Sequence, residues 1–156
     1  MSLFGAIDIS GSGVSAERLR MDVTAENLAN AQSTQGADGQ PYRRKEVVLR
    51  QAGGGSFDGA LSTAMGAAGV GGSTSATGTP ARGVEVVQIA EDQAPNRMVY
   101  DPGHPDADAN GYVSMPNVDP VTEMVDLIAA SRAYEANVTA MQTAKSMFTK
   151  TLDLLK

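Results

Sequence analysis

The C-terminal part of the chain contains a long stretch in which nothing interrupts a helix. Asp119 is a residue type that caps helix N-termini, and Pro120 suits the first helical position, where its missing N–H is not needed. Neither Gly nor Pro occurs from Val121 to Lys156. We therefore expect one long helix to begin at Pro120 and to continue toward the C-terminus.

Apolar residues recur along this helix at alternating spacings of three and four, which is the pattern of a helix that packs against other helices. Only Ser131 and Lys145 interrupt the stripe. A flanking stripe of small residues from Ala133 to Ala144 would let a further helix approach closely. The residues that we expect to pack against other helices are Met124, Leu127, Tyr134, Val138, Met141, Phe148, Leu152 and Leu155.

A second, less regular stripe predicts a helix from Leu3 to about Asn30. Gly11 and Arg18 interrupt it, and each glycine in a helix costs about 1 kcal/mol relative to alanine. The apolar residues of this stripe are Phe4, Ile7, Val14, Met21 and Leu28. Periodicity alone leaves two arrangements open: the terminal helices pair as an antiparallel hairpin within one chain, or they pack against neighbouring subunits.

The residues between the two helices predict a small β-rich insertion in a mainly α-helical chain. The expected strands lie within Tyr42–Arg50, Gly83–Ile89, Met98–Tyr100 and Tyr112–Met115. The apolar alternation slips between Val86 and Val87, as a β-bulge would make it.

These elements divide the chain into three expected parts. They are an N-terminal helix at 1–35, a central β-rich or extended segment at 36–118, and a C-terminal helix at 119–156. Within the central part, residues 53–81 are rich in Gly, Ala, Ser and Thr, which is the composition of a flexible linker. We expect this linker to be mobile or poorly ordered.

Charge and composition argue against several classes of function. With 12 Lys and Arg against 18 Asp and Glu, the net charge of -6 disfavours binding to nucleic acid or to anionic membranes. No apolar run approaches the roughly 20 residues that cross a bilayer as a helix. Met1 to Ile9 lacks the basic start of a secretory signal peptide. We expect a chain that binds no nucleic acid and is not inserted in a membrane.

No group of residues predicts catalysis, a cofactor or a metal site. The only histidine, His104, lies among the aspartates of segment 101–108, whose two prolines and glycine favour a turn in which Asp side chains bond their own backbone. A small metal-dependent enzyme centred on His104 is the rival hypothesis. The basic run Arg43, Arg44 and Lys45, beside Glu46, favours a solvated strand edge or a charge contact between subunits.

Several motifs resemble those of the bacterial flagellar axial proteins, which form the rod and the hook. The segment Ala25–Ala31 resembles the Asn-Leu-Ala-Asn signature of that family and is followed by Pro41–Lys45. Other motifs are similar to those of the proximal rod subunits: Val99–Ala107, Gly111–Val113, Pro116–Val118, Glu123–Leu127 and Ala130–Asn137.

This resemblance implies a structural subunit of the proximal rod, which lies in the flagellar basal body and spans the periplasm, rather than an enzyme. The implied partners are copies of the same chain, adjacent proximal rod and rod-adaptor subunits, and the flagellar type III export apparatus, through which the family leaves the cell without a cleaved signal peptide. The family's terminal helices are largely disordered in the free subunit and assemble into a coiled-coil tube that transmits torque. The residues themselves leave an alternative, a self-contained helical hairpin that acts as a binding module.

Overall fold

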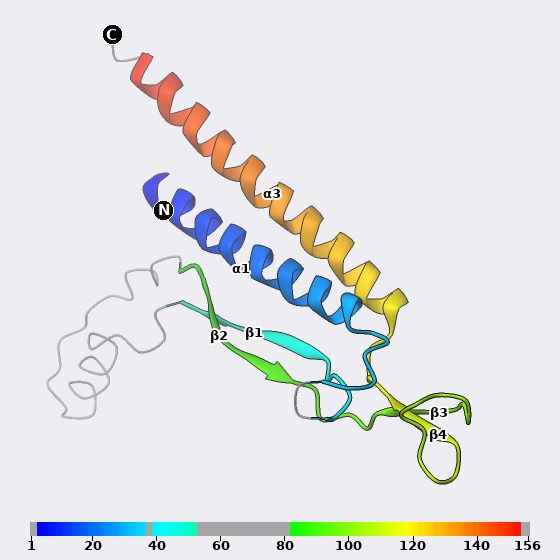
Figure 1. The fold of residues 1–156 in the computed structure, drawn as a ribbon. Coiled ribbons are helices and arrows are strands. Elements are labelled where there is room, and N and C mark those ends of the chain that lie inside the picture. The colour runs from blue at the N-terminus through cyan, green and yellow to red at the C-terminus, as the bar shows by residue number, and fades with distance from the viewer. Residues whose placement is uncertain (1–2, 37–38, 53–81, 154–156) are drawn as a thin grey trace, which may run out of the picture.

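The computed structural model describes residues 3–36, 39–52 and 82–153, with the side chains of residues 3 and 4 outside the description. Two long antiparallel helices lie side by side, and two small antiparallel sheets accompany them (Figure 1). The elements are α1 (Leu3–Ala29), β1 (Lys45–Gln51), β2 (Val84–Glu91), β3 (Arg97–Tyr100), β4 (Tyr112–Met115) and α3 (Pro120–Asp153). The prediction of a mainly helical chain with a small β insertion is confirmed.

Helix α3 begins where the capping residues predict. The Asp119 carboxylate accepts hydrogen bonds from the Val121 N–H at 3.1 Å and from the Thr122 hydroxyl at 2.9 Å. These bonds satisfy donors that have no partner inside the first helical turn. The 34 residues of α3 give a helix of about 51 Å, longer than the 27-residue α1.

Small side chains form the line along which the two helices approach most closely. Ala130 and Ala144 of α3 are buried. Gly13 of α1 lies against Asn137, so near that a Cβ built on the glycine would be 2.9 Å from the Asn137 Nδ2 atom. Because small residues keep the backbones close, large apolar side chains on either flank are only partly covered.

The helix pair is staggered. Asn27, near the end of α1, contacts Glu123 at the start of α3, and Gly11 lies opposite Met141. The last turns of α3 therefore extend beyond the start of α1 (Figure 1). Exposed apolar residues mark this end of α3, among them Met147 and Leu152.

Strands β1 and β2 pair with the predicted bulge. Val48 is opposite Gln88 and Leu49 is opposite Val86, which leaves Val87 as the additional residue. The start of β2 is held on α1, because the Val84 N–H donates to the Ser12 Oγ at 3.0 Å. The predicted strands at 98–100 and 112–115 are also present as the antiparallel pair β3 and β4.

Some expectations concern residues outside this description. The linker expected at 53–81 is among them, and the division of the chain into three parts stays a prediction. Among the described residues, neither helix combines the length and the apolar character that a bilayer crossing requires.

Two glycines of α1 offer a matched test of the close helix contact. A Cβ on Gly11 would meet only the Met141 Cε, at an ordinary 3.8 Å, whereas a Cβ on Gly13 would press on the Asn137 amide. We expect Gly11→Ala to raise the free energy of unfolding by about 1 kcal/mol through helix propensity. Gly13→Ala should gain little or lose stability, as measured by urea unfolding followed by circular dichroism. An equal gain for both variants would contradict the close approach at Gly13.

Candidate functional site

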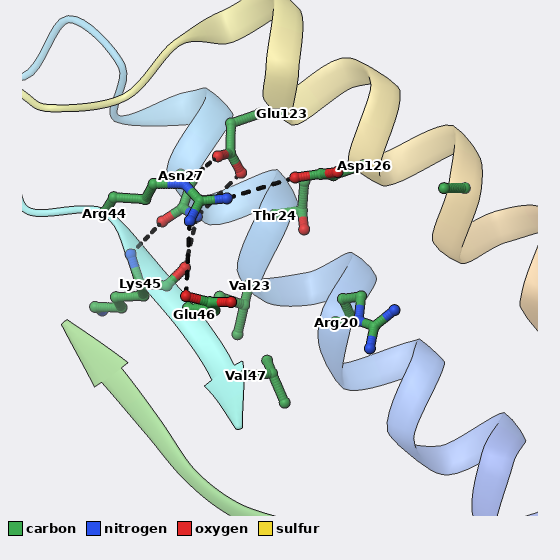
Figure 2. Close-up of a pocket in the computed structure, with 11 residues that line it drawn as sticks. Arg20, Val23, Thr24, Asn27, Arg44, Lys45, Glu46, Val47, Glu123 and Asp126 are labelled. Atoms are coloured by element: carbon green, nitrogen blue, oxygen red, sulfur yellow. Dashed lines mark hydrogen bonds and ion pairs between the residues drawn. The ribbon is translucent and has the colours of Figure 1, made fainter. Parts of the chain in front are cut away.

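A buried polar network joins the end of α1, the residues that lead into β1, and the first turn of α3. Its centre is formed by Asn27 and Glu123, each only 1% exposed. Figure 2 shows both side chains meeting Arg44 between the two helices. We call the group formed by Asn27, Tyr42, Arg44, Glu123 and the Lys45 backbone the Asn27 clamp.

Both the nitrogen and the oxygen of the Asn27 side-chain amide form hydrogen bonds. Its Nδ2 group donates to the Lys45 carbonyl at 2.8 Å and to the Glu123 Oε2 at 3.1 Å. Its Oδ1 accepts from the Lys45 N–H and from the Tyr42 hydroxyl, both at 2.9 Å. Among side chains of this size only an amide supplies two donors and a double acceptor, since aspartate cannot donate and leucine can do neither. The position therefore requires asparagine.

The buried Glu123 carboxylate is paired with a cation. The Arg44 Nε lies 2.6 Å from the Glu123 Oε1, and the Arg44 Nη2 lies 3.4 Å from the Asp126 Oδ2. The backbone N–H of Arg44 donates to the Asn117 Oδ1 at 2.9 Å. The hydrogen bond with Glu123 raises the pKa of Arg44 above its ordinary value, although partial burial acts in the opposite direction. Arg44 therefore stays charged and compensates the buried carboxylate.

The basic run 43–45 makes its contacts within the chain. Besides the Arg44 pair, the Lys45 Nζ lies 2.6 Å from the Glu26 Oε1, and the Arg43 Nη1 donates to the Asp92 carbonyl at 3.5 Å. The interpretation of this run as a solvated edge is therefore wrong for Arg44, whose charge compensates the buried Glu123 carboxylate. The pair of Lys45 with Glu26 is exposed, and a contact of this run with another subunit stays a prediction.

The structure places the predicted packing residues beside the line of closest helix contact rather than on it. The most deeply buried apolar residues of the two helices are instead Ala16, Val23, Ala130 and Ala144. Half-buried members of the predicted stripes are Ile7, Val14, Met21, Leu28, Leu127, Tyr134, Val138 and Met141. Exposed members are Met124, Phe148 and Leu152. The side chains of Phe4 and Leu155 lie outside the described residues.

The two predicted stripes meet at a groove between the helices. Its apolar lining consists of Met21 of α1 and of Leu127 and Ile128 of α3. Its polar side is formed by Ser131, Arg132 and Glu135. We call this feature the interhelical groove. Its apolar floor is covered only in part by the chain itself, since Ile128 is 56% exposed.

The segment around His104 is a turn, as the prolines and glycine predict. The Asp101 carboxylate accepts the Gly103 N–H at 3.1 Å, and the Asp108 Oδ1 accepts the N–H groups of Asn110 and Tyr112 at 2.8 and 3.0 Å. In the part of the chain that the structure describes, no three His, Cys, Asp or Glu side chains are arranged to hold a metal ion.

Sequence reasoning missed the Asn27 clamp. In the sequence Asn27 stands out only as part of a signature, and Glu123 only as part of a motif. A signal did exist, because Glu123 begins a series at sevenfold spacing, continued by Ala130, Asn137 and Ala144, that forms the contact line of α3. A carboxylate at the head of a line of small and polar residues indicates a buried partner on the opposite helix.

Two protein families match this chain, one at its N-terminal helix and one at its C-terminal helix. The family described as "Flagella basal body rod protein" matches residues 7–37, which contain most of α1. The family described as "Flagellar basal body rod FlgEFG protein C-terminal" matches residues 109–154, which contain α3. A fold of paired terminal helices with these two matches defines the class of flagellar rod proteins.

Full-length relatives narrow the class to one family. The chain is 47% identical to the flagellar basal-body rod protein FlgC of Salmonella typhimurium over 99% of this chain and 98% of the relative. It is 48% identical to FlgC of Escherichia coli O157:H7 over the same shares. It is 45% identical to FlgC of Bacillus subtilis over the whole of both chains. The chain therefore belongs to the FlgC family of flagellar basal-body rod proteins, and it is a structural subunit of the rod.

The ion pair of the Asn27 clamp can be tested against a matched surface pair. Arg44→Ala leaves the buried Glu123 carboxylate without its cation, and we expect a loss of about 3 kcal/mol in the free energy of unfolding. Adding Glu123→Gln should recover part of that loss. Arg50 forms a similar but exposed pair with Glu85, so Arg50→Ala should cost less than about 1 kcal/mol. Equal losses for Arg44→Ala and Arg50→Ala in urea unfolding would contradict the role of the clamp.

The Tyr42 hydroxyl gives the clamp a signature at high pH. Burial, followed by the nearby charges of Glu26, Glu123 and Glu91, raises the pKa of Tyr42 from 10.0 to about 12. Because the pKa is raised in the folded state, this contribution to stability is full below pH 10 and is lost as the pH rises toward 12. Ultraviolet titration of tyrosinate in the parent and in Tyr42→Phe isolates the absorbance change of Tyr42 as the difference between the two curves. We expect this difference to develop near pH 12, and a difference that develops near pH 10 would show that Tyr42 is not held as described.

Proposed function

We propose that this subunit joins its neighbours in the proximal rod through the sides of its terminal helices that the chain leaves uncovered. The observation that carries the proposal is the apolar surface of α3. Seven of its large apolar side chains are more than a third exposed, although α1 packs along it. They are Val121, Met124, Val125, Ile128, Met147, Phe148 and Leu152.

This surface is arranged for helical neighbours. Val121, Val125 and Ile128 recur at spacings of four and three, so they share one side of α3, roughly opposite the buried Glu123 and Ala130. A soluble monomer rarely exposes a continuous apolar patch of this kind. Its burial against another subunit yields roughly 25 cal/mol for each Å² removed from water. Of the predicted packing residues, Met124 lies next to this side. Phe148 and Leu152 lie on the side of the contact line with α1 and are exposed near the end of α3, where it extends beyond α1.

The mechanism that follows is mechanical. Torque passes along a rod when each subunit holds its own helices in a fixed relation and presses rigid helix faces on its neighbours. The Asn27 clamp supplies the first condition, since it ties α1, the start of β1 and α3 with buried bonds. The exposed side of α3 supplies the second. We infer that the subunit works without a catalysed reaction, a cofactor or a metal ion.

The partners and the location follow from the family. We propose copies of the same chain, adjacent proximal rod and rod-adaptor subunits, and the flagellar type III export apparatus as partners. The rod places the assembled subunit across the periplasm, which it reaches without a cleaved signal peptide. The relatives' names as basal-body rod proteins support this proposal.

A self-contained binding module is the second candidate, and one observation favours it. The terminal helices pair within a single chain, as a helical hairpin would. In that case the uncovered side of α3 would hold some other ligand, and its loss would leave the rod intact.

An aspartate introduced on the uncovered side of α3 distinguishes the rod subunit from the self-contained binding module. Val125 is 60% exposed, so we expect Val125→Asp to change the free energy of unfolding by less than about 0.5 kcal/mol. In the rod the same aspartate would be buried without a partner, which is costly. We therefore expect the variant to be exported but absent from purified basal bodies, as detected by immunoblotting, and the cells to lose motility.

The matched control is Gln142→Asp, which introduces the same charge at an exposed polar position of α3. This control should assemble like the parent. Normal incorporation of Val125→Asp into basal bodies would contradict the proposed interface.

A further inference from the structure

The β3–β4 hairpin carries an aromatic patch that the rod interface described above does not use. The strand register places Met98, Tyr100 and Tyr112 on one face, with 56%, 64% and 43% of their surfaces exposed. The opposite face is turned inward, since Val113 is 1% exposed. The two tyrosine rings pack edge to face with their centroids 5.3 Å apart. Exposed tyrosine and methionine side chains that gather in this way are typical of the centre of a protein interface.

The hairpin holds this patch in a fixed shape. Gly111 has a φ of +82°, and a Cβ at that position would lie 3.0 Å from the Tyr100 ring, so the turn is closed tightly against the ring. The Asp101 N–H donates to the Gly111 carbonyl at 2.9 Å, and Asp108 accepts two N–H groups of the same turn. A patch that is already ordered loses little conformational entropy when it binds.

The charge around the patch selects the partner. Asp101 directly follows β3 and Asp108 lies in the turn before β4; both are exposed, and neither has an ion-pair partner among the described residues. The only cationic candidate in this turn is His104, which lies 3.8 Å from Asp106. An apolar patch with a negative rim is complementary to an apolar surface with a free cation at its edge.

The interhelical groove of the same chain has that complementary character. Met21, Leu127 and Ile128 form its apolar lining, and Arg132 stands beside them. Within the described residues the Arg132 guanidinium has no hydrogen bond or ion pair. The hairpin extends away from its own helices (Figure 1), so it can enter such a groove only on another molecule.

We propose that the β3–β4 hairpin of one copy docks in the interhelical groove of the next copy. Tyr100, Tyr112 and Met98 cover the apolar lining, and the Asp101 and Asp108 carboxylates face Arg132. Because two different surfaces meet, the contact is heterologous and repeats from copy to copy instead of closing a dimer. The contact rests on the proposed assembly of the chain in the rod and adds a specific connection to it.

Site-specific crosslinking tests this contact, and the absence of cysteine from the chain makes it clean. Asn110→Cys lies at the exposed hairpin turn, and Ser131→Cys lies in the groove. Neither residue is one of the docking anchors. The matched control pairs Asn110→Cys with Ala129→Cys, which lies two residues away but borders the pocket beside Arg44 instead of the groove. Basal bodies from motile cells are treated with a short bismaleimide and analysed on denaturing gels.

We expect crosslinked products larger than dimers when Asn110→Cys and Ser131→Cys are combined in one chain, because each copy can then be joined to two neighbours. Each single-cysteine variant can form at most a dimer, and the control pair should show few larger products. If the double variant fails to assemble, co-expression of the two single variants, one of them tagged, gives the same test through a tagged–untagged dimer. Assembled rods without a crosslink between Asn110→Cys and Ser131→Cys would overturn this contact and leave the proposed function standing. Motile cells whose basal bodies lack the protein would instead overturn the proposed function.

Discussion

A carboxylate buried between two helices is stable only when a cation and hydrogen-bond donors compensate it, and Glu123 meets this condition through Arg44 and Asn27. The partners come from three separate parts of the chain: α1, the residues before β1, and α3. The bonds among these partners tie the three parts to one another. The position of the helix pair, and of the sheet beside it, depends on this network.

The second constraint is the small size of the residues along the helix contact. Gly13 and the buried alanines of α3 bring the backbones close, and so the larger apolar side chains lie on the flanks. A chain with few aromatic residues and a contact line of alanines cannot cover all of α3 by itself. The uncovered side is therefore a consequence of how the pair packs, and assembly into a rod gives it a partner.

The elements could be read from the sequence because their signals are local. The Asp119 cap, the absence of Gly and Pro after it, and the slip at Val86 and Val87 each depend on neighbours in the chain, and each was confirmed. The Asn27 clamp could not be read in this way. Its bond between Asn27 and Glu123 joins residues that are distant in the sequence, and the sevenfold series that begins at Glu123 marks a buried line on α3 without identifying the partner.

The helical stripes show a related limit. The spacing of apolar residues shows which sides of the helices are apolar. It does not show that Ala130 and Ala144 lie where the two helices are closest, with Leu127 and Met141 beside them. That choice depends on how near two backbones can come, which glycine and alanine on both helices decide together. The interpretation of Arg44 as a surface charge is wrong for a related reason, because its partner Glu123 comes from α3, far away in the sequence.

Amide hydrogen exchange, compared between the free protein and isolated basal bodies, tests the central claim most directly. The account predicts slow exchange in the free protein around Asn27, Arg44 and the first turns of α3, where the clamp holds the chain. It predicts faster exchange from Met147 to Asp153, where α3 extends beyond the start of α1, and strong protection of that segment after assembly. Uniformly slow exchange along the whole of α3 in the free protein, with no gain in basal bodies, would contradict the account.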